Sequence, residues 1–166
     1  MKQNVQPVAL LLTLAFAVLL PACQDENAAQ EASNKNTISA LFAAMDAGET
    51  AKFGDYCSPD FQIYHPFLSE PGSLQVFQGL IQGQKTGFPD MKHEIVQVVA
   101  EGNLVAVRGV FKGANTGSMQ GNPPTGNRVE LPFIVIDEFD ATGKLKIRRV
   151  QFDTGAFQAQ LMAAKM

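Results

Sequence analysis

The chain of 166 residues contains no tryptophan, two cysteines and two histidines, and its net charge is only −3. The cysteines and histidines are too few, and too widely spaced, for a metal site or a redox pair. We therefore expect neither a metal site nor a redox pair. Basic residues form no cluster outside 144–149, so we expect no binding to nucleic acid.

The long apolar run lies at the N-terminus. Lys2 precedes the apolar stretch 8–20, which has the length of a secretory signal and is shorter than the roughly 20 residues of a transmembrane helix. The following sequence, Leu-Pro-Ala-Cys, resembles a lipobox, in which Cys23 would become the acylated first residue of a bacterial lipoprotein. We therefore predict a signal peptide at 1–22 and an exported protein of the cell envelope. A lipid on Cys23 would anchor it to a membrane, facing the periplasm if the organism has two membranes. The alternative is plain secretion after cleavage.

The rest of the chain divides into a short linker and one domain. Residues 23–35 are polar and rich in alanine, which predicts a flexible tether. Residues 36–166 suffice for one domain with a single core. If Cys23 carries lipid, Cys57 has no partner, and we expect it to be buried and unreactive.

Helical periodicity occurs twice in the first half of the domain. Apolar residues recur at helical spacing over 38–45 and 74–81, after the capping residues Asn36-Thr37 and Ser73. A shorter helix is expected over 50–56.

The second half of the domain has the alternating pattern of strands. We predict a short strand over 61–64, one hairpin of 94–100 with 104–111, and a second of 131–139 with 145–152. Helices followed by an antiparallel meander predict an α+β fold, in which N-terminal helices pack on a curved antiparallel sheet.

Asp153 ends the last predicted strand, where a carboxylate is unusual. If Asp140 faces Lys144 in the second hairpin, Leu131 pairs with Asp153, and both point to the apolar inner face. An apolar neighbourhood disfavours an ionised carboxyl group. Asp153 is therefore predicted to be a protonatable acid in a pocket. The alternative is an N-cap for the helix that follows it.

The same strand register sorts the other polar residues of the last strand. Arg149 and Gln151 would share the inner face with Asp153, and Arg148 would lie on the outer face. Arg108 stands in an otherwise apolar strand, where an inward side chain could hold a carboxylate or enolate oxygen. Its alternative role is a structural salt bridge. His93 stands between Lys92 and a glutamate, which predicts a solvated setting.

Three segments carry a resemblance to a known family. They are GFPDMKHEIVQVVAEGNLVAVRGVFKGANTG at 87–117, GNPPTG at 121–126 and GKLKIRRVQFDTGAFQAQL at 143–161. Their order and spacing resemble the SnoaL-like polyketide cyclase family of the nuclear transport factor 2-like superfamily. The segment His65-Pro66-Phe67 is similar to the upstream His-containing segment of that family.

The resemblance implies a cone-shaped α+β barrel with a deep apolar cavity. It also implies that Asp153 matches the carboxylate that acts as general acid and base in the cyclases, which close a ring by intramolecular aldol condensation without metal or cofactor. Two positions depart from the family pattern. Arg149 stands where a tryptophan is frequent, and Asn115 replaces a histidine, so the substrate of the antibiotic cyclases is not carried over.

Two functional hypotheses follow. In the first, the protein binds a small hydrophobic carbonyl compound and catalyses cofactor-independent aldol cyclisation, isomerisation or a lyase reaction through Asp153 and His65. In the second, it is a non-catalytic lipoprotein that binds a small hydrophobic ligand. A homodimer is possible in either case. The residues predicted to contact the ligand are Arg108, Phe77, Phe88, Phe111, Phe133, Asn115, Arg149 and Gln151.

Overall fold

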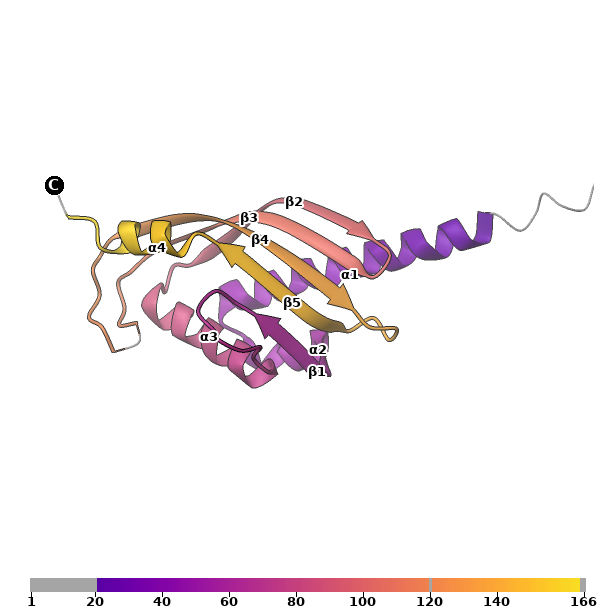
Figure 1. Cartoon of the computed structure of the whole chain (residues 1–166), viewed down its shortest axis with the longest axis horizontal. Helices are drawn as coiled ribbons and strands as arrows, with labels where there is room; N and C mark the ends of the chain where they lie inside the picture. The colour runs from indigo at the N-terminus through magenta and orange to yellow at the C-terminus, as the bar shows by residue number, and fades with distance from the viewer. Residues whose placement is uncertain (1–20, 120, 165–166) are drawn as a thin grey trace, which may run out of the picture.

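The computed structural model describes residues 21–119 and 121–164. Its elements in chain order are α1 (Pro21–Ala47), the 3-10 helix η1 (Thr50–Lys52), α2 (Phe53–Tyr56), β1 (Cys57–Tyr64), α3 (Leu74–Gly87), β2 (Lys92–Glu101), β3 (Leu104–Ala114), β4 (Arg128–Phe139), β5 (Leu145–Phe152) and α4 (Thr154–Leu161). The five strands form one sheet in the order β1-β5-β4-β3-β2. Figure 1 shows α1 and α3 on the same side of this long, curved sheet.

The predicted α+β class and both predicted hairpins are confirmed. β2 with β3, β3 with β4 and β4 with β5 pair in antiparallel fashion, whereas β1 joins the edge of β5 in parallel. Along β4, every second residue from Val129 to Phe139 is buried, so one face of the strand packs into the core. The core therefore fills the space between the concave face of the sheet and the helices that cover it.

The predicted flexible tether at 23–35 is wrong, because this segment belongs to α1. Alanine, glutamine and glutamate are strong helix formers, and they make up most of the segment. Asn34 is buried and donates through Nδ2 to the carbonyl of Gly102, and Oε1 of Glu31 accepts from the Gly102 N–H at 2.9 Å. The helix is thus attached to the turn between β2 and β3, and its first turns extend past the sheet (Figure 1).

The predicted signal peptide falls almost wholly on residues 1–20, which lie outside the described residues. Secretion, lipid attachment at Cys23 and location in the cell envelope stay predictions. Within 21–119 and 121–164, no helix is both long enough and apolar enough to cross a membrane. Cys57 is buried, as expected, and burial raises the pKa of its thiol to about 12, which makes it a poor nucleophile.

The predicted register of the second hairpin holds at its turn and fails beyond it. Phe139 pairs with Leu145 as expected, but an irregularity follows, and Glu138 pairs with Ile147. One extra residue on β5 shifts the register by one position and exchanges the two faces of the strand. Arg148 is consequently buried opposite Asp137, whereas it was predicted on the outer face.

The outer face of the sheet exposes several large apolar side chains. They are Val99, Leu104, Ile134 and Ile136. The homodimer predicted from the sequence stays a prediction, and we propose this face as the surface for it.

The loop between β3 and β4 is fixed against the end of α3 at Gly117. The Gly117 N–H donates to the carbonyl of Gly87, and a Cβ built on Gly117 would lie within 1.8 Å of the Thr86 carbonyl oxygen. Neither partner can withdraw, because both are backbone groups. The position therefore requires glycine.

We predict that Gly117→Ala destabilises the protein by about 1–3 kcal/mol, the usual cost of forcing an extra methyl group into a packed site. Gly54→Ala is the matched control, because nothing lies within 4 Å of a Cβ there and Gly54 is helical. Urea denaturation of the three proteins measures the effect. Equal loss of stability in the two variants would contradict the tight docking of this loop.

Candidate functional site

A cavity of about 610 Å³ lies in the core and receives side chains from both the helices and the sheet. Its volume is in the range of sites for small organic ligands. Most of the lining is apolar: Phe42, Met45, Ile63, Phe67, Val76, Phe77, Leu80, Ile81, Phe111, Met119, Leu131, Phe133, Val135, Val150, Phe152 and Phe157, with Gly79 and Gly83. The polar lining residues are His65, Gln84, His93, Arg148 and Gln158. An apolar chamber with a few polar groups is typical of a ligand site.

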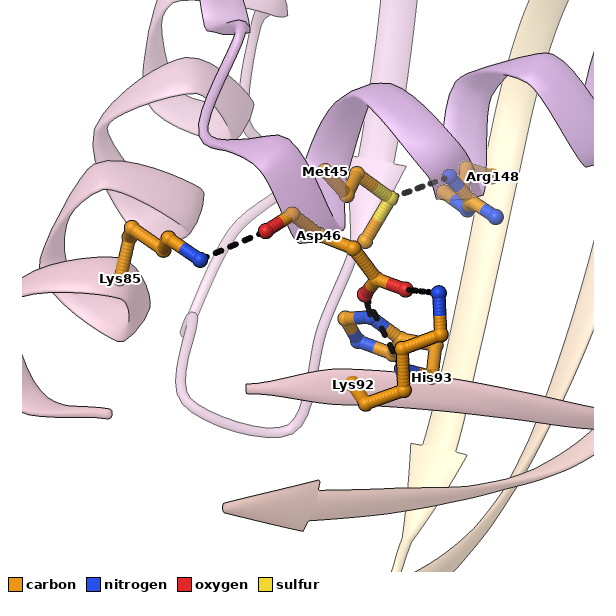
Figure 2. Close-up of polar contacts among 6 residues, drawn as sticks. All are labelled: Met45, Asp46, Lys85, Lys92, His93 and Arg148. Atoms are coloured by element: carbon orange, nitrogen blue, oxygen red, sulfur yellow. Dashed lines mark hydrogen bonds and ion pairs between the residues drawn. The ribbon is translucent and has the colours of Figure 1, made fainter. Parts of the chain in front are cut away.

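His93, on β2, is held against the cavity by Asp46 at the end of α1. Nδ1 of His93 lies 2.6 Å from Oδ1 of Asp46, and the backbone N–H of His93 donates to the same oxygen at 3.0 Å. Lys92 forms an ion pair with the other carboxylate oxygen at 2.8 Å. Figure 2 shows these contacts, together with the bond from Lys85 to the Asp46 carbonyl. The expected solvated setting of His93 is wrong, since its ring is buried.

This arrangement defines which nitrogen of His93 is free to react. Burial alone would raise the pKa of Asp46, but hydrogen bonds from His93 and Lys92 outweigh it, and the pKa lies below its usual value. Asp46 is therefore a carboxylate, which only accepts hydrogen bonds, so the proton of a neutral His93 resides on Nδ1. In this tautomer the lone pair is on Nε2. A histidine oriented in this way by a carboxylate is the usual form of a general base.

Three phenylalanines hold the His93 ring in place. The ring centroids of Phe42, Phe111 and Phe133 lie 5.4, 5.4 and 5.7 Å from that of His93. Such a cage prevents the imidazole from turning away from Asp46, so it holds the base in one orientation.

His65, at the end of β1, supplies a second imidazole, and its proton lies on the other ring nitrogen. Its Nδ1 accepts from the backbone N–H of Phe67 at 3.3 Å, and its ring packs against Phe67 and Phe152. Burial, with a smaller contribution from the charge of Arg148, lowers the pKa of His65 to about 4. At neutral pH the ring is thus uncharged, with its proton on Nε2. It can donate a hydrogen bond to a ligand oxygen.

Arg148 and Asp137 form a buried ion pair at the cavity wall. Nε of Arg148 lies 3.3 Å from Oδ1 of Asp137, and Nη2 donates to Oδ2 at 3.3 Å. Both side chains are almost wholly buried, but only Arg148 lines the cavity. Burial raises the pKa of Asp137 to about 6, although the charge of Arg148 opposes the rise.

Asp153 does not occupy the predicted position. It is exposed, it is not among the residues that line the cavity, and its Oδ1 accepts from the Ala156 N–H at 2.9 Å as the N-cap of α4. The helix-cap alternative is confirmed, and the expectation of an apolar pocket around this carboxyl is wrong. The physical reason is that β5 ends at Phe152, whose side chain takes the inward direction.

The other predicted contacts divide into two groups. His65, Phe77, Phe111 and Phe133 line the cavity, as expected. Five do not: Phe88, Arg108, Asn115, Arg149 and Gln151.

The residues outside the cavity have other surroundings. Phe88 is buried against Phe111, and Asn115 accepts from Thr125 and donates to the carbonyls of Gly87 and Gly117, which organises the loop between β3 and β4. Arg108 and Gln151 are exposed on the outer face of the sheet.

Arg149 moves outward through the register shift described above, and it lies over the ring of Tyr64. Its guanidinium also forms an ion pair with Glu138 at 3.7 Å.

Sequence reasoning missed Asp46, Asp137 and the inward position of Arg148. Asp46 and His93 are 47 residues apart, and no local pattern links them. Asp137 stands at an inward position of a predicted strand, which was the available signal of a buried charge. Within the described part of the chain, no group of three or more His, Cys, Asp or Glu side chains is arranged to hold a metal ion.

A curved sheet that encloses a cavity with its covering helices defines the cone-like α+β fold of the nuclear transport factor 2-like class. Residues 35–161 match the family model of the SnoaL-like polyketide cyclases. The chain therefore belongs to the SnoaL-like polyketide cyclase family. A comparison with curated protein sequences found no match.

Solved structures share this fold. A SnoaL-like protein from Jannaschia sp. CCS1 is 22% identical, with a TM-score of 0.72 over 81% of this chain and 95% of that one. IdmH from Streptomyces antibioticus is 26% identical, with a TM-score of 0.67 over 77% and 97%. A SnoaL-like polyketide cyclase from Agrobacterium tumefaciens is 17% identical, with a TM-score of 0.64 over 77% and 97%.

The low pKa of His65 makes a prediction about stability. As the pH falls from 6.5 toward 4, the unfolded chain binds a proton on His65 that the folded protein does not bind, so stability is lost in this window. The loss at pH 5 is about 2 kcal/mol for a pKa that falls from 6.5 to about 4.

Asp137 has a raised pKa, so its contribution to stability increases as the pH falls, opposite to that of His65. The test therefore compares the wild type with His65→Gln, because both proteins contain Asp137. Urea denaturation at pH 7.5 and pH 5 should show that acidification costs the wild type more than the variant. An equal cost in both proteins would mean that His65 is not held in its neutral form.

Proposed function

We propose that the cavity binds a small, largely apolar carbonyl compound and that His93 removes a proton from the carbon next to the carbonyl group. The single observation that carries this proposal is the Asp46–His93 pair at the cavity wall. It supplies an oriented base inside an apolar chamber, which is where proton transfer at carbon is favoured by desolvation and fixed geometry.

The second imidazole complements the first. A carbonyl oxygen becomes negative as the neighbouring carbon loses its proton, so a hydrogen-bond donor near that oxygen lowers the barrier. His65 lines the same cavity and carries its proton on Nε2. We assign it this donor role. A base and a donor on one cavity suit aldol cyclisation, isomerisation or elimination, and family membership supports this class of reaction.

A non-catalytic role is the second candidate. The carboxyl that matches the acid/base group of the family, Asp153, caps α4 and does not line the cavity. That observation favours a protein that has kept the cavity to carry a hydrophobic ligand. The catalytic role predicted for Asp153 itself stays a prediction.

The test is the exchange of hydrogen for deuterium at the activated carbon of 2-tetralone in D2O, followed by proton NMR. We expect the wild type to exceed the buffer control, and His93→Gln and Asp46→Asn each to reduce the enzymatic rate by about 10²–10⁴-fold. Asp153→Asn, which retains a good capping residue, should stay within about threefold of the wild type.

The outcomes separate the candidates. Binding of 2-tetralone without exchange would support the carrier and contradict the catalytic proposal. Exchange that is lost in Asp153→Asn and kept in His93→Gln would return the acid/base role to Asp153. Circular dichroism of each variant establishes that it is folded before its rate is compared.

A further inference from the structure

Arg148 gives the cavity a charged group that the proposed proton transfer does not use. Its side chain is 1% exposed. Among the described residues that line the cavity it is the one Arg or Lys, and none of them is Asp or Glu. A buried guanidinium stays protonated, so it demands acceptors for its N–H groups.

The protein does not supply enough acceptors. A guanidinium has five N–H donors. The hydrogen bonds made by described residues are one from Nη1 to the Met45 sulfur at 3.6 Å and one from Nη2 to Oδ2 of Asp137 at 3.3 Å. A thioether is a weak acceptor. Donors of Arg148 therefore remain for a ligand.

The carboxylate of Asp137 uses only one of its two oxygens to accept a hydrogen bond from the guanidinium. Its Oδ1 lies 3.3 Å from Nε of Arg148 but accepts no hydrogen bond from the described residues. Charge-assisted pairs of this kind normally close to about 2.7–2.9 Å, often with two parallel bonds. The pair is therefore loose, with Asp137 behind the wall and Arg148 on the cavity side.

Aromatic rings restrict how a ligand could reach Arg148. The guanidinium carbon lies 4.8 Å from the centroid of the Phe42 ring and 5.5 Å from that of Phe77. These rings provide no oxygen or nitrogen acceptor, so the N–H groups that Asp137 and Met45 do not bind still need one. A carboxylate is the acceptor whose two oxygens match a guanidinium in bidentate fashion.

We propose that the ligand is an oxo acid with an apolar body, whose carboxylate binds Arg148 while its carbonyl group lies near His93. The inference rests on the proposed function and adds the substrate class. Phe42 contacts both groups, so the Arg148 guanidinium carbon and the His93 ring centroid lie no more than about 10 Å apart. One small molecule can therefore reach both.

The test compares two probes of the same shape, 2-naphthoate and the uncharged 2-acetonaphthone. Isothermal titration calorimetry measures the dissociation constant of each probe without needing a fluorescent group. We expect the wild type to bind 2-naphthoate at least tenfold more tightly. Tighter binding of 2-acetonaphthone, or equal binding, would overturn the carboxylate site while leaving the cavity in place. Binding of neither probe would contradict both the inference and the proposed function.

A double variant assigns the preference to the ion pair. Arg148→Met alone would leave Asp137 unpaired and could unfold the protein, whereas the double variant Arg148→Met/Asp137→Leu replaces the pair by apolar groups, a change that proteins often tolerate. The double variant should bind 2-acetonaphthone as before and lose its preference for 2-naphthoate. A preference that persists would place the anion site elsewhere.

Asp137→Asn should act in the opposite direction. It removes the negative charge behind Arg148, so 2-naphthoate should bind more tightly than to the wild type, and it should raise the melting temperature of the variant more than that of the wild type. If Asp137 has only a structural role, Asp137→Asn should weaken the binding of both probes alike. That result would overturn the assignment of Asp137 as the residue that positions Arg148.

If His93→Gln abolishes exchange yet keeps the preference for 2-naphthoate, the two sites are independent, as the inference requires.

Discussion

One extra residue in β5, just after the turn from β4, determines which side chains the cavity receives. Because side chains alternate along a strand, a shift of one position exchanges the two faces of everything that follows. The shift turns Arg148 inward against Asp137 and directs its neighbour Arg149 to the outer face, over Tyr64. Without it, the inner wall would carry a different arginine with no carboxylate opposite.

The two polar pairs of the core differ in whether burial or the partner residues dominate the pKa of the carboxyl group. Asp46 is bound by His93 and Lys92 at the rim of the core, and its hydrogen bonds outweigh the cost of burial. Asp137 is completely enclosed, and burial outweighs the attraction of Arg148. The first pair is therefore a stable, oriented base, and the second is an incompletely satisfied ion pair. In a mostly apolar chamber, these two pairs and His65 supply the titratable and charged groups that a ligand meets.

Much of the fold could be predicted from local pattern. Apolar spacing identified the helix of Leu74–Gly87, and alternation with turn residues identified both hairpins, because these signals depend on neighbours in sequence. The helix at 23–35 was missed because the composition of this segment suits both a disordered linker and a helix, and contacts with the distant Gly102 stabilise the helix. Long-range contacts of this kind leave no local trace.

The site was predicted less well, for related reasons. His65 was found through its place in a family segment, but Asp46 and His93 come from separate elements that meet only in the folded chain. Asp153 was placed in the pocket by extending a regular register through an irregular strand. The error was one residue, and it was enough to place an exposed, capping carboxylate inside the pocket.

The most direct test of these conclusions is a crystal structure of the protein with bound 2-naphthoate. We predict that the naphthalene ring lies in the cavity between α3 and the sheet, that the carboxylate meets the N–H edge of Arg148, and that the ring passes close to Nε2 of His93. Binding on the outer face of the sheet or beside Asp153, with an empty cavity, would contradict the assignment of this chamber as the functional site.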